Sequence, residues 1–134
     1  MSIWGRRISI ERVAIVAVIL MVVVGVARVV TRGNVREITV VARDMAFYAD
    51  RDEKTANPVI EVKAGETVRI ILKNRDRGMT HDFAVPALGA STHAIDWNEE
   101  DEMTIYVPKK PGTYEYVCQP HVLMMKGTLK VIGD

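Results

Sequence analysis

The chain has 134 residues, with 18 Lys and Arg against 17 Asp and Glu, so its formal net charge is +1. From Thr31 onward it carries 14 basic and 16 acidic residues, a net charge of −2. This balance argues against nucleic acid as a partner, because binding to nucleic acid requires a basic face. The single cysteine excludes an intrachain disulfide, so the folded part must be held together by its core. The length leaves room for one domain.

The N-terminal segment is apolar or glycine throughout residues 13–27, and residues 29–30 extend this run past Arg28. A full membrane span needs about 20 apolar residues, which the run reaches if Arg28 extends its side chain toward the lipid headgroups. We predict that residues 1–32 form a membrane anchor with one transmembrane helix. A secretory signal peptide cleaved after Ala27 is the main alternative, and a buried core helix is a third.

Beyond residue 34 the pattern changes to short segments in which apolar and polar residues alternate. In the segment from Thr67 to Lys73, for example, the apolar residues fall on one face and Arg69 falls on the other, as in a half-buried strand. No stretch shows a helical period. Short strands separated by turn residues predict an all-β Greek-key sandwich over residues 33–134. We predict strands at 35–42, 45–48, 59–63, 67–73, 103–107, 113–118 and 127–132, an extended segment at 81–86, and irregular chain at 87–101.

The stretch of residues 114–127 holds the only cysteine, Cys118, together with His121 and the pair Met124 and Met125. Thiolate, imidazole and thioether ligands form a soft set that selects copper. A second imidazole must come from elsewhere, and His81 is the best candidate. If the strands beside His81 and Cys118 are neighbours, these groups meet at one end of the sandwich. Two histidines and a cysteine with a weak methionine are the ligands of blue-copper sites.

Each of these residues also has a plain structural interpretation. A lone cysteine is more often a buried apolar residue than a ligand, and the methionines could fill the core. The combination at the end of a strand favours a metal site. Zinc is the alternative metal, because it also accepts two histidines and a cysteine, but it gains little from a thioether.

From about Val35 to its end the chain resembles the cupredoxins, the family of plastocyanin and amicyanin. Asn74 lies a few residues ahead of His81, as in that family. The other matching motifs are Cys118-Gln119-Pro120-His121, Met125-Lys126-Gly127, and the turn Pro111-Gly112-Thr113-Tyr114. The resemblance covers about three quarters of the chain and implies a cupredoxin fold.

The resemblance further implies that one copper ion is bound by His81, Cys118 and His121, with an axial methionine. The usual position of that methionine, two residues before a glycine, selects Met125, whereas amicyanin-like spacing selects Met124. The loop is one residue longer than that of amicyanin and one shorter than that of plastocyanin. Asp82 stands where many relatives carry asparagine, and we expect it to tie the two ligand loops together by hydrogen bonds.

The sequence supports interpretations of three further features. We predict that His93 is a surface loop residue. The acidic run at residues 99–102 is interpreted as a solvated turn before a strand, with docking of a basic redox partner as the alternative. The family resemblance also implies an apolar patch through which electrons leave by the edge of the His121 ring. That patch would consist of Pro120, Val122, Leu123 and Met124.

The predicted function is one-electron transfer by a blue copper protein that is not an enzyme. Its expected partners are redox proteins, membrane-bound or respiratory, and its copper domain is expected outside the cytoplasm, on the periplasmic or extracellular face. One alternative is a copper-handling protein that captures or delivers Cu(I). Another is a subunit resembling subunit II of haem-copper oxidases. A dinuclear copper centre is excluded in that case, because it needs two cysteines and the chain has one.

Overall fold

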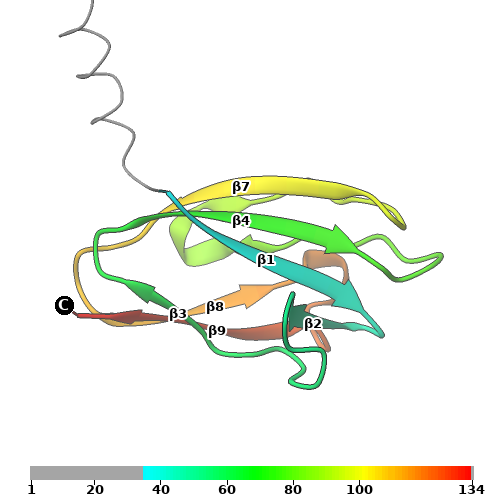
Figure 1. Cartoon of the computed structure of the whole chain (residues 1–134), viewed down its shortest axis with the longest axis horizontal. Coiled ribbons are helices and arrows are strands. Elements are labelled where there is room, and N and C mark those ends of the chain that lie inside the picture. Colours follow the sequence, from blue (N-terminus) through cyan, green and yellow to red (C-terminus); the bar gives the residue numbers. More distant parts are fainter. Residues whose placement is uncertain (1–34, 134) are drawn as a thin grey trace, which may run out of the picture. The chain divides into compact units, whose positions relative to one another are not determined.

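The computed structural model describes residues 35–133, which form two β-sheets packed face to face (Figure 1). One sheet has the strand order β2-β1-β4-β7 and the other has the order β3-β9-β8-β5-β6. In both sheets, neighbouring strands are often distant in sequence, as Greek-key connections require. The strands are β1 (Arg36–Arg43), β2 (Ala46–Ala49), β3 (Ile60–Lys63), β4 (Thr67–Asn74), β5 (Ala84–Val85), β6 (Ala90–Ser91), β7 (Glu100–Tyr106), β8 (Gly112–Val117) and β9 (Lys126–Ile132).

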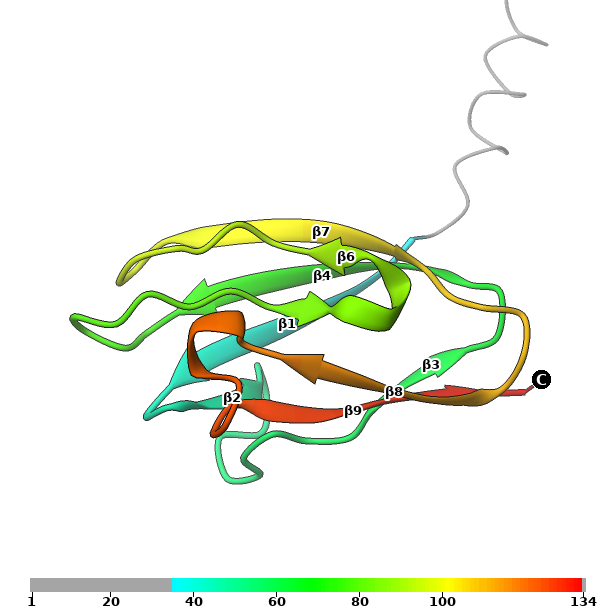
Figure 2. The ribbon, with the colours of Figure 1, turned by 180° about the vertical axis from the view of Figure 1, so that it is seen from behind.

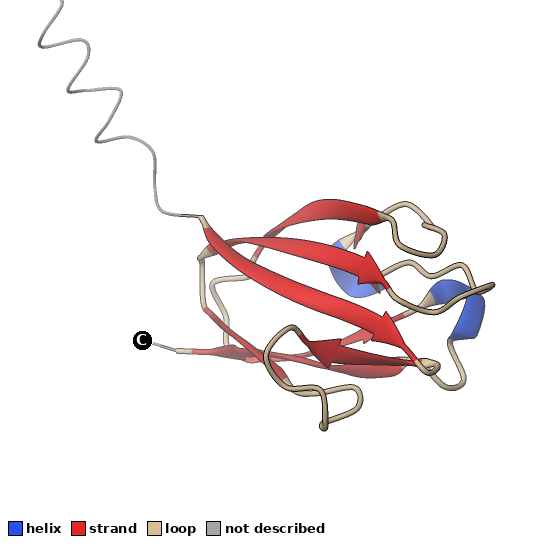
Figure 3. Cartoon of the chain, turned by 45° about the vertical axis from the view of Figure 1, so that its right-hand side comes forward, coloured by secondary structure: helices blue, strands red, loops and turns tan. Residues whose placement is uncertain are grey.

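The prediction of an all-β fold is confirmed for the described range. Its helical elements are two single 3-10 turns, η1 (Pro86–Leu88) and η2 (Gln119–His121), which lie beside the strands (Figure 3). Both turns have proline at their first or second position, where its missing N–H leaves no hydrogen bond unmade.

The alternation in β4 places its apolar residues in the space between the sheets. Val68, Ile70 and Leu72 are each 0% exposed, and Val68 and Ile70 face Ile105 and Met103 of β7 in the register of that pair. Burying side chains of this size contributes about 1.5–3 kcal/mol each. The core thus follows from the two-residue period of the sequence.

Three aromatic side chains pack together next to the segments that carry the candidate ligands. Phe83 stacks on Tyr116 with ring centroids 4.9 Å apart, and Phe47 meets both rings edge-on at 5.1 and 5.7 Å. Phe83 follows His81 by two residues and Tyr116 precedes Cys118 by two. This packing gives both segments a rigid support, because interiors at crystal-like density resist displacement.

The acidic run was predicted to be a turn, and this was wrong for three of its four residues. Strand β7 begins at Glu100, so residues 100–102 belong to it. The physical reason is the neighbouring strand β4, which carries basic side chains. Lys73 Nζ lies 3.8 Å from Glu100 Oε1, and Arg69 Nη1 lies 3.5 Å from Glu102 Oε2. Opposite charges on adjacent strands favour pairing, so the run extends the strand.

The extended segment at 81–86 is shorter as a strand than predicted. Only Ala84 and Val85 form β5: Pro86 begins the turn η1, and His81 makes only an isolated bridge with Ile95. The region predicted to be irregular contains η1 and the two-residue strand β6, which pairs with β5. The other predicted strands are present with shifts of at most one residue at each end, except that β7 begins three residues before its predicted start.

The predicted membrane anchor, residues 1–32, lies outside the described residues. Its helix and the domain boundary at residue 33 therefore stay predictions. The described residues contain no helix with the length and apolar character that crossing a bilayer demands.

Candidate metal centre

Pairing between β5 and β8 brings the candidate ligands together. These strands are antiparallel, with Ala84 opposite Val117, so the chain entering β5 lies beside the chain leaving β8. His81 lies three residues before β5 and Cys118 directly follows β8, where the chain turns into η2 (Figure 2). The predicted neighbourhood of these two strands is confirmed. Two backbone hydrogen bonds with Ile95, of 3.1 and 2.8 Å, hold the His81 backbone in place.

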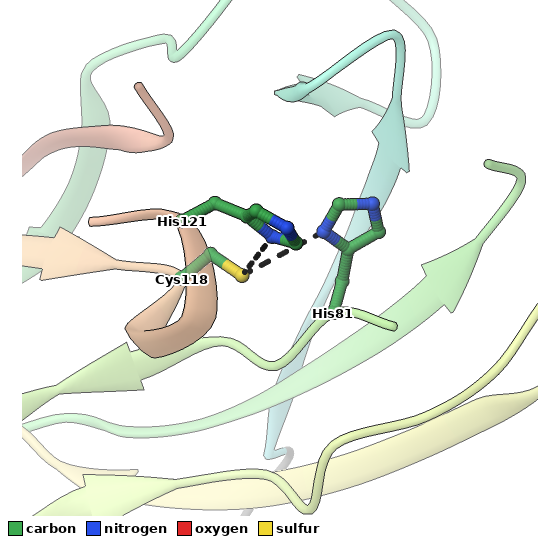
Figure 4. A group of neighbouring side chains, drawn as sticks. All are labelled: His81, Cys118 and His121. Carbon is green, nitrogen blue, oxygen red and sulfur yellow. Dashed lines mark hydrogen bonds between the residues drawn. The ribbon is translucent and has the colours of Figure 1, made fainter. Parts of the chain in front are cut away.

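The sulfur of Cys118 faces one nitrogen of each histidine (Figure 4). Cys118 Sγ lies 3.6 Å from His81 Nδ1 and 3.5 Å from His121 Nδ1, and the three candidate ligand atoms all lie within 4.8 Å of one another. The two imidazole rings are tilted by 56°, with centroids 4.9 Å apart. All three groups therefore point toward one common point.

These separations suit ligands around a single ion. Metal–nitrogen and metal–sulfur bonds of about 2.0 and 2.3 Å, at angles near 110°, place nitrogen and sulfur about 3.6 Å apart. The donors are one thiol and two imidazoles, which suit copper or zinc and do not suit magnesium or calcium. The residues present therefore fit a soft transition-metal ion.

The two candidate axial methionines differ in burial. Met125 is 0% exposed and belongs to the same apolar cluster as Cys118, whereas Met124 is 61% exposed. The backbone of Met125 also closes the ligand loop, because its carbonyl accepts the Cys118 N–H at 2.9 Å and its N–H donates to the His121 carbonyl at 2.9 Å. Burial beside the thiol favours Met125 as the thioether ligand.

Comparison with known proteins places this arrangement in a family. A family model described as a cupredoxin-like domain matches residues 13–131. The chain belongs to the cupredoxin-like family. No curated protein sequence matches it significantly.

Solved structures show the same fold. Auracyanin B shares 26% identity over 72% of this chain and 88% of its own, with a TM-score of 0.57. Auracyanin A from Chloroflexus aurantiacus, described as a "blue" copper protein, shares 24% identity over 72% and 98%, with a TM-score of 0.53. Rusticyanin from Thiobacillus ferrooxidans shares 22% identity over 75% and 79%, with a TM-score of 0.56.

In this cupredoxin-like domain, burial sets the electrostatics of the candidate ligands. Desolvation lowers the pKa of His81, which opposes the effect of the nearby Asp76 carboxylate, so the ring is neutral at pH 7. Burial also raises the pKa of the Cys118 thiol to about 11, although hydrogen bonds from the backbone of Asp82 and His121 act in the opposite direction. A metal ion must therefore displace the thiol proton when it binds.

The predicted link between the two ligand loops is confirmed. The Gln119 N–H donates to Asp82 Oδ1 at 2.6 Å, so the residue after His81 holds the residue after Cys118. Asp82 is 4% exposed, and a hydrogen bond from a backbone N–H to a buried carboxylate contributes more than one between neutral groups.

Two residues that support the site were not predicted from the sequence. Asp76 lies 3.0 Å from His81 Nε2 through one carboxylate oxygen. Asn57, at a positive φ of 49°, accepts the Phe47 N–H at 3.0 Å and donates to the Met124 carbonyl at 3.3 Å. Its only signal in the sequence is that asparagine tolerates left-handed backbone.

His93 stands apart from the candidate metal centre. Its side chain is 95% exposed, and both its backbone N–H and its Nδ1 lie near Asp101 Oδ2, at 2.7 and 3.1 Å. The prediction of a surface residue is confirmed. The third histidine is thus held by a carboxylate and contributes nothing to the cluster of His81, Cys118 and His121.

Proposed function

We propose that the chain binds one copper ion through His81, Cys118, His121 and Met125 and carries single electrons between redox partners. The observation that carries this proposal is that Cys118 Sγ lies 3.6 Å from His81 Nδ1 and 3.5 Å from His121 Nδ1. Met125, whose backbone is hydrogen-bonded to that of Cys118, is buried. Copper, when bound, supplies the one-electron chemistry by alternating between Cu(I) and Cu(II). Nothing in this proposal requires the chain to transform a substrate.

The protein's own contribution is to hold the ligands in place before and after each transfer. The loop from Cys118 to Met125 is closed by four backbone hydrogen bonds of 2.9–3.1 Å. Asp76 holds His81 and Asp82 holds the start of the loop. Ligands that are already arranged need little movement on oxidation or reduction, and little movement favours fast electron transfer.

The exposed residues around His121 suggest where a partner docks. His121 is partly exposed, whereas His81 is 0% exposed. Next to His121, Val122, Leu123 and Met124 are 44%, 89% and 61% exposed. Contiguous exposed apolar groups are typical of protein interaction sites. We propose that a redox protein docks on this patch and exchanges electrons through the His121 ring.

The predicted N-terminal anchor supports a place for this carrier at a membrane. An apolar run at residues 13–27 would keep the copper domain at a membrane, close to membrane-bound or respiratory partners. We propose that the domain lies outside the cytoplasm, on the periplasmic or extracellular face.

The deciding experiment is a spectrum of the full-length chain, kept in detergent micelles and loaded with Cu(II). We expect an intense blue or green absorption band and an electron paramagnetic resonance spectrum with narrow parallel hyperfine splitting. A weak spectrum of ordinary type 2 copper would contradict the proposal. Retention of Cu(I) alone would also contradict it and would favour copper handling.

The axial ligand can be tested by comparing two neighbouring variants. Met125→Leu removes the buried thioether with little change in volume, so we expect it to shift the reduction potential. Met124→Leu changes an exposed side chain and is expected to leave the potential nearly unchanged. Cyclic voltammetry of both copper-loaded variants makes the comparison. A larger shift for Met124→Leu would assign the axial position to Met124.

A further inference from the structure

The carboxylate of Asp76 joins a distant turn to the candidate ligand His81. Its Oδ1 accepts the backbone N–H of Asp44 at 2.7 Å, and its Oδ2 accepts the N–H of Met45 at 3.0 Å. The same Oδ2 lies 3.0 Å from His81 Nε2. The Asp76 side chain is 15% exposed and that of His81 is 0% exposed, so the ring nitrogen and the carboxylate meet largely away from water.

The turn that Asp76 holds has an unusual backbone. Asp44 and Met45 form the two-residue connection between Arg43 of β1 and Ala46 of β2, which face each other in the register. Their φ angles are +51° and +57°, as in a type I′ turn, a conformation that normally selects asparagine or glycine. Two N–H groups of this turn are satisfied by one carboxylate, which offsets the cost of the left-handed conformation.

Hydrogen bonding to Asp76 also determines which nitrogen of His81 carries the proton. A neutral imidazole has one N–H and one lone pair. An ionised carboxylate can only accept, so Nε2 must be the donor in this contact. The lone pair then remains on Nδ1, the atom that lies 3.6 Å from Cys118 Sγ. A hydrogen-bonded carboxylate of this kind orients a metal-binding histidine and increases its basicity.

We propose that Asp76 is the positioning residue that fixes the orientation and the tautomer of His81, and that the turn at Asp44 and Met45 holds Asp76 in place for that role. This inference rests on the proposed function, because it takes His81 to be a copper ligand. It extends the site to β1 and β2, which contribute none of the candidate ligand atoms.

The first test needs no metal. In the metal-free, full-length protein at mildly alkaline pH, nitrogen-15 nuclear magnetic resonance of the histidine rings should show His81 protonated at Nε2. Protonation at Nδ1 in the wild type would overturn the proposal, and this holds even if no variant folds. In Asp76→Asn the side-chain amide has only one acceptor oxygen, so its NH2 group must face at least one of the N–H groups of Asp44, Met45 and His81. We therefore expect His81 to lose its uniform Nε2–H tautomer.

Asp101→Asn provides the matched control. Asp101 also accepts a backbone N–H and contacts a histidine ring, that of His93, but this pair lies outside the metal cluster. The control should leave the His81 ring signals unchanged. Asp76→Glu keeps the charge on a longer side chain and should restore the Nε2–H tautomer. Equal His81 signals in the wild type and in Asp76→Asn would refute the positioning role.

The second test measures copper binding by competition with a chelator. Loss of such a supporting contact typically costs about 10–100-fold in metal affinity, and we expect a loss in that range for Asp76→Asn and no loss for Asp101→Asn. Equal affinities of the two variants would overturn the proposal. The two proposals can fail separately. If metal-free wild type shows a uniform Nε2–H tautomer of His81 but the copper-loaded protein gives a type 2 spectrum, electron transfer is contradicted and the positioning role of Asp76 is not.

Discussion

Replacing Cys118 with serine should abolish the intense visible colour of the copper-loaded protein. The visible band of such sites arises from charge transfer between a thiolate and copper, and Cys118 is the only cysteine of the chain. A serine hydroxyl is not ionised near neutral pH and is a harder ligand than a thiolate. Absorption and electron paramagnetic resonance spectra of the wild type and Cys118→Ser, recorded at equal copper loading, measure the effect.

The control must separate the loss of the ligand from the loss of the fold. Serine is nearly isosteric with cysteine, so the metal-free variant should keep the circular dichroism spectrum of the wild type. Met124→Leu, in the exposed part of the same loop, should keep the band. Colour that survives in Cys118→Ser would refute the assignment of Cys118 as a copper ligand.

The parts of the fold that were predicted correctly are those determined by local pattern. The alternation of Val68, Ile70 and Leu72 specifies a strand whatever its neighbours are, and the structure places all three in the core. The start of β7 was misplaced because Glu100 pairs with Lys73 of another strand. Local sequence carries no information about that partner, so a run of four acidic residues resembled a solvated turn.

The same distinction applies to the candidate site. Cys118 and His121 could be predicted as candidate ligands because the cysteine loop is a short motif, and the structure brings them together with His81. The choice between Met124 and Met125 stayed open, because loop length does not determine which side chain turns inward, and burial now favours Met125. Asp76 could not be predicted, because two of its three hydrogen-bond donors are backbone N–H groups of a turn more than thirty residues away. Backbone donors are the same for every residue type except proline.

Replacing Gly127 with alanine should strongly destabilise the domain. A Cβ atom at this position would overlap Oη and Cζ of Tyr116 and lie 2.8 Å from its Cε1. Tyr116 lies opposite Gly127 in the pairing of β8 with β9, so its ring crosses the strand where the side chain is missing. The ring cannot move aside easily, because it stacks on Phe83 and its hydroxyl donates to the Pro58 carbonyl at 2.6 Å.

We expect Gly127→Ala to lower the free energy of unfolding of the metal-free protein by about 3 kcal/mol, at the upper end of the usual cost of overpacking. Urea unfolding followed by circular dichroism measures this change. The matched control is Gly112→Ala in β8, where an added Cβ meets nothing within 4 Å, and there we expect a change within about 0.5 kcal/mol. Gly127 is the second residue of β9 and lies two residues after Met125, so the displaced Tyr116 ring should also weaken copper binding. Equal stabilities of the two alanine variants would show that the Tyr116 ring can move aside. The aromatic cluster would then support the ligand loop much less than its packing indicates.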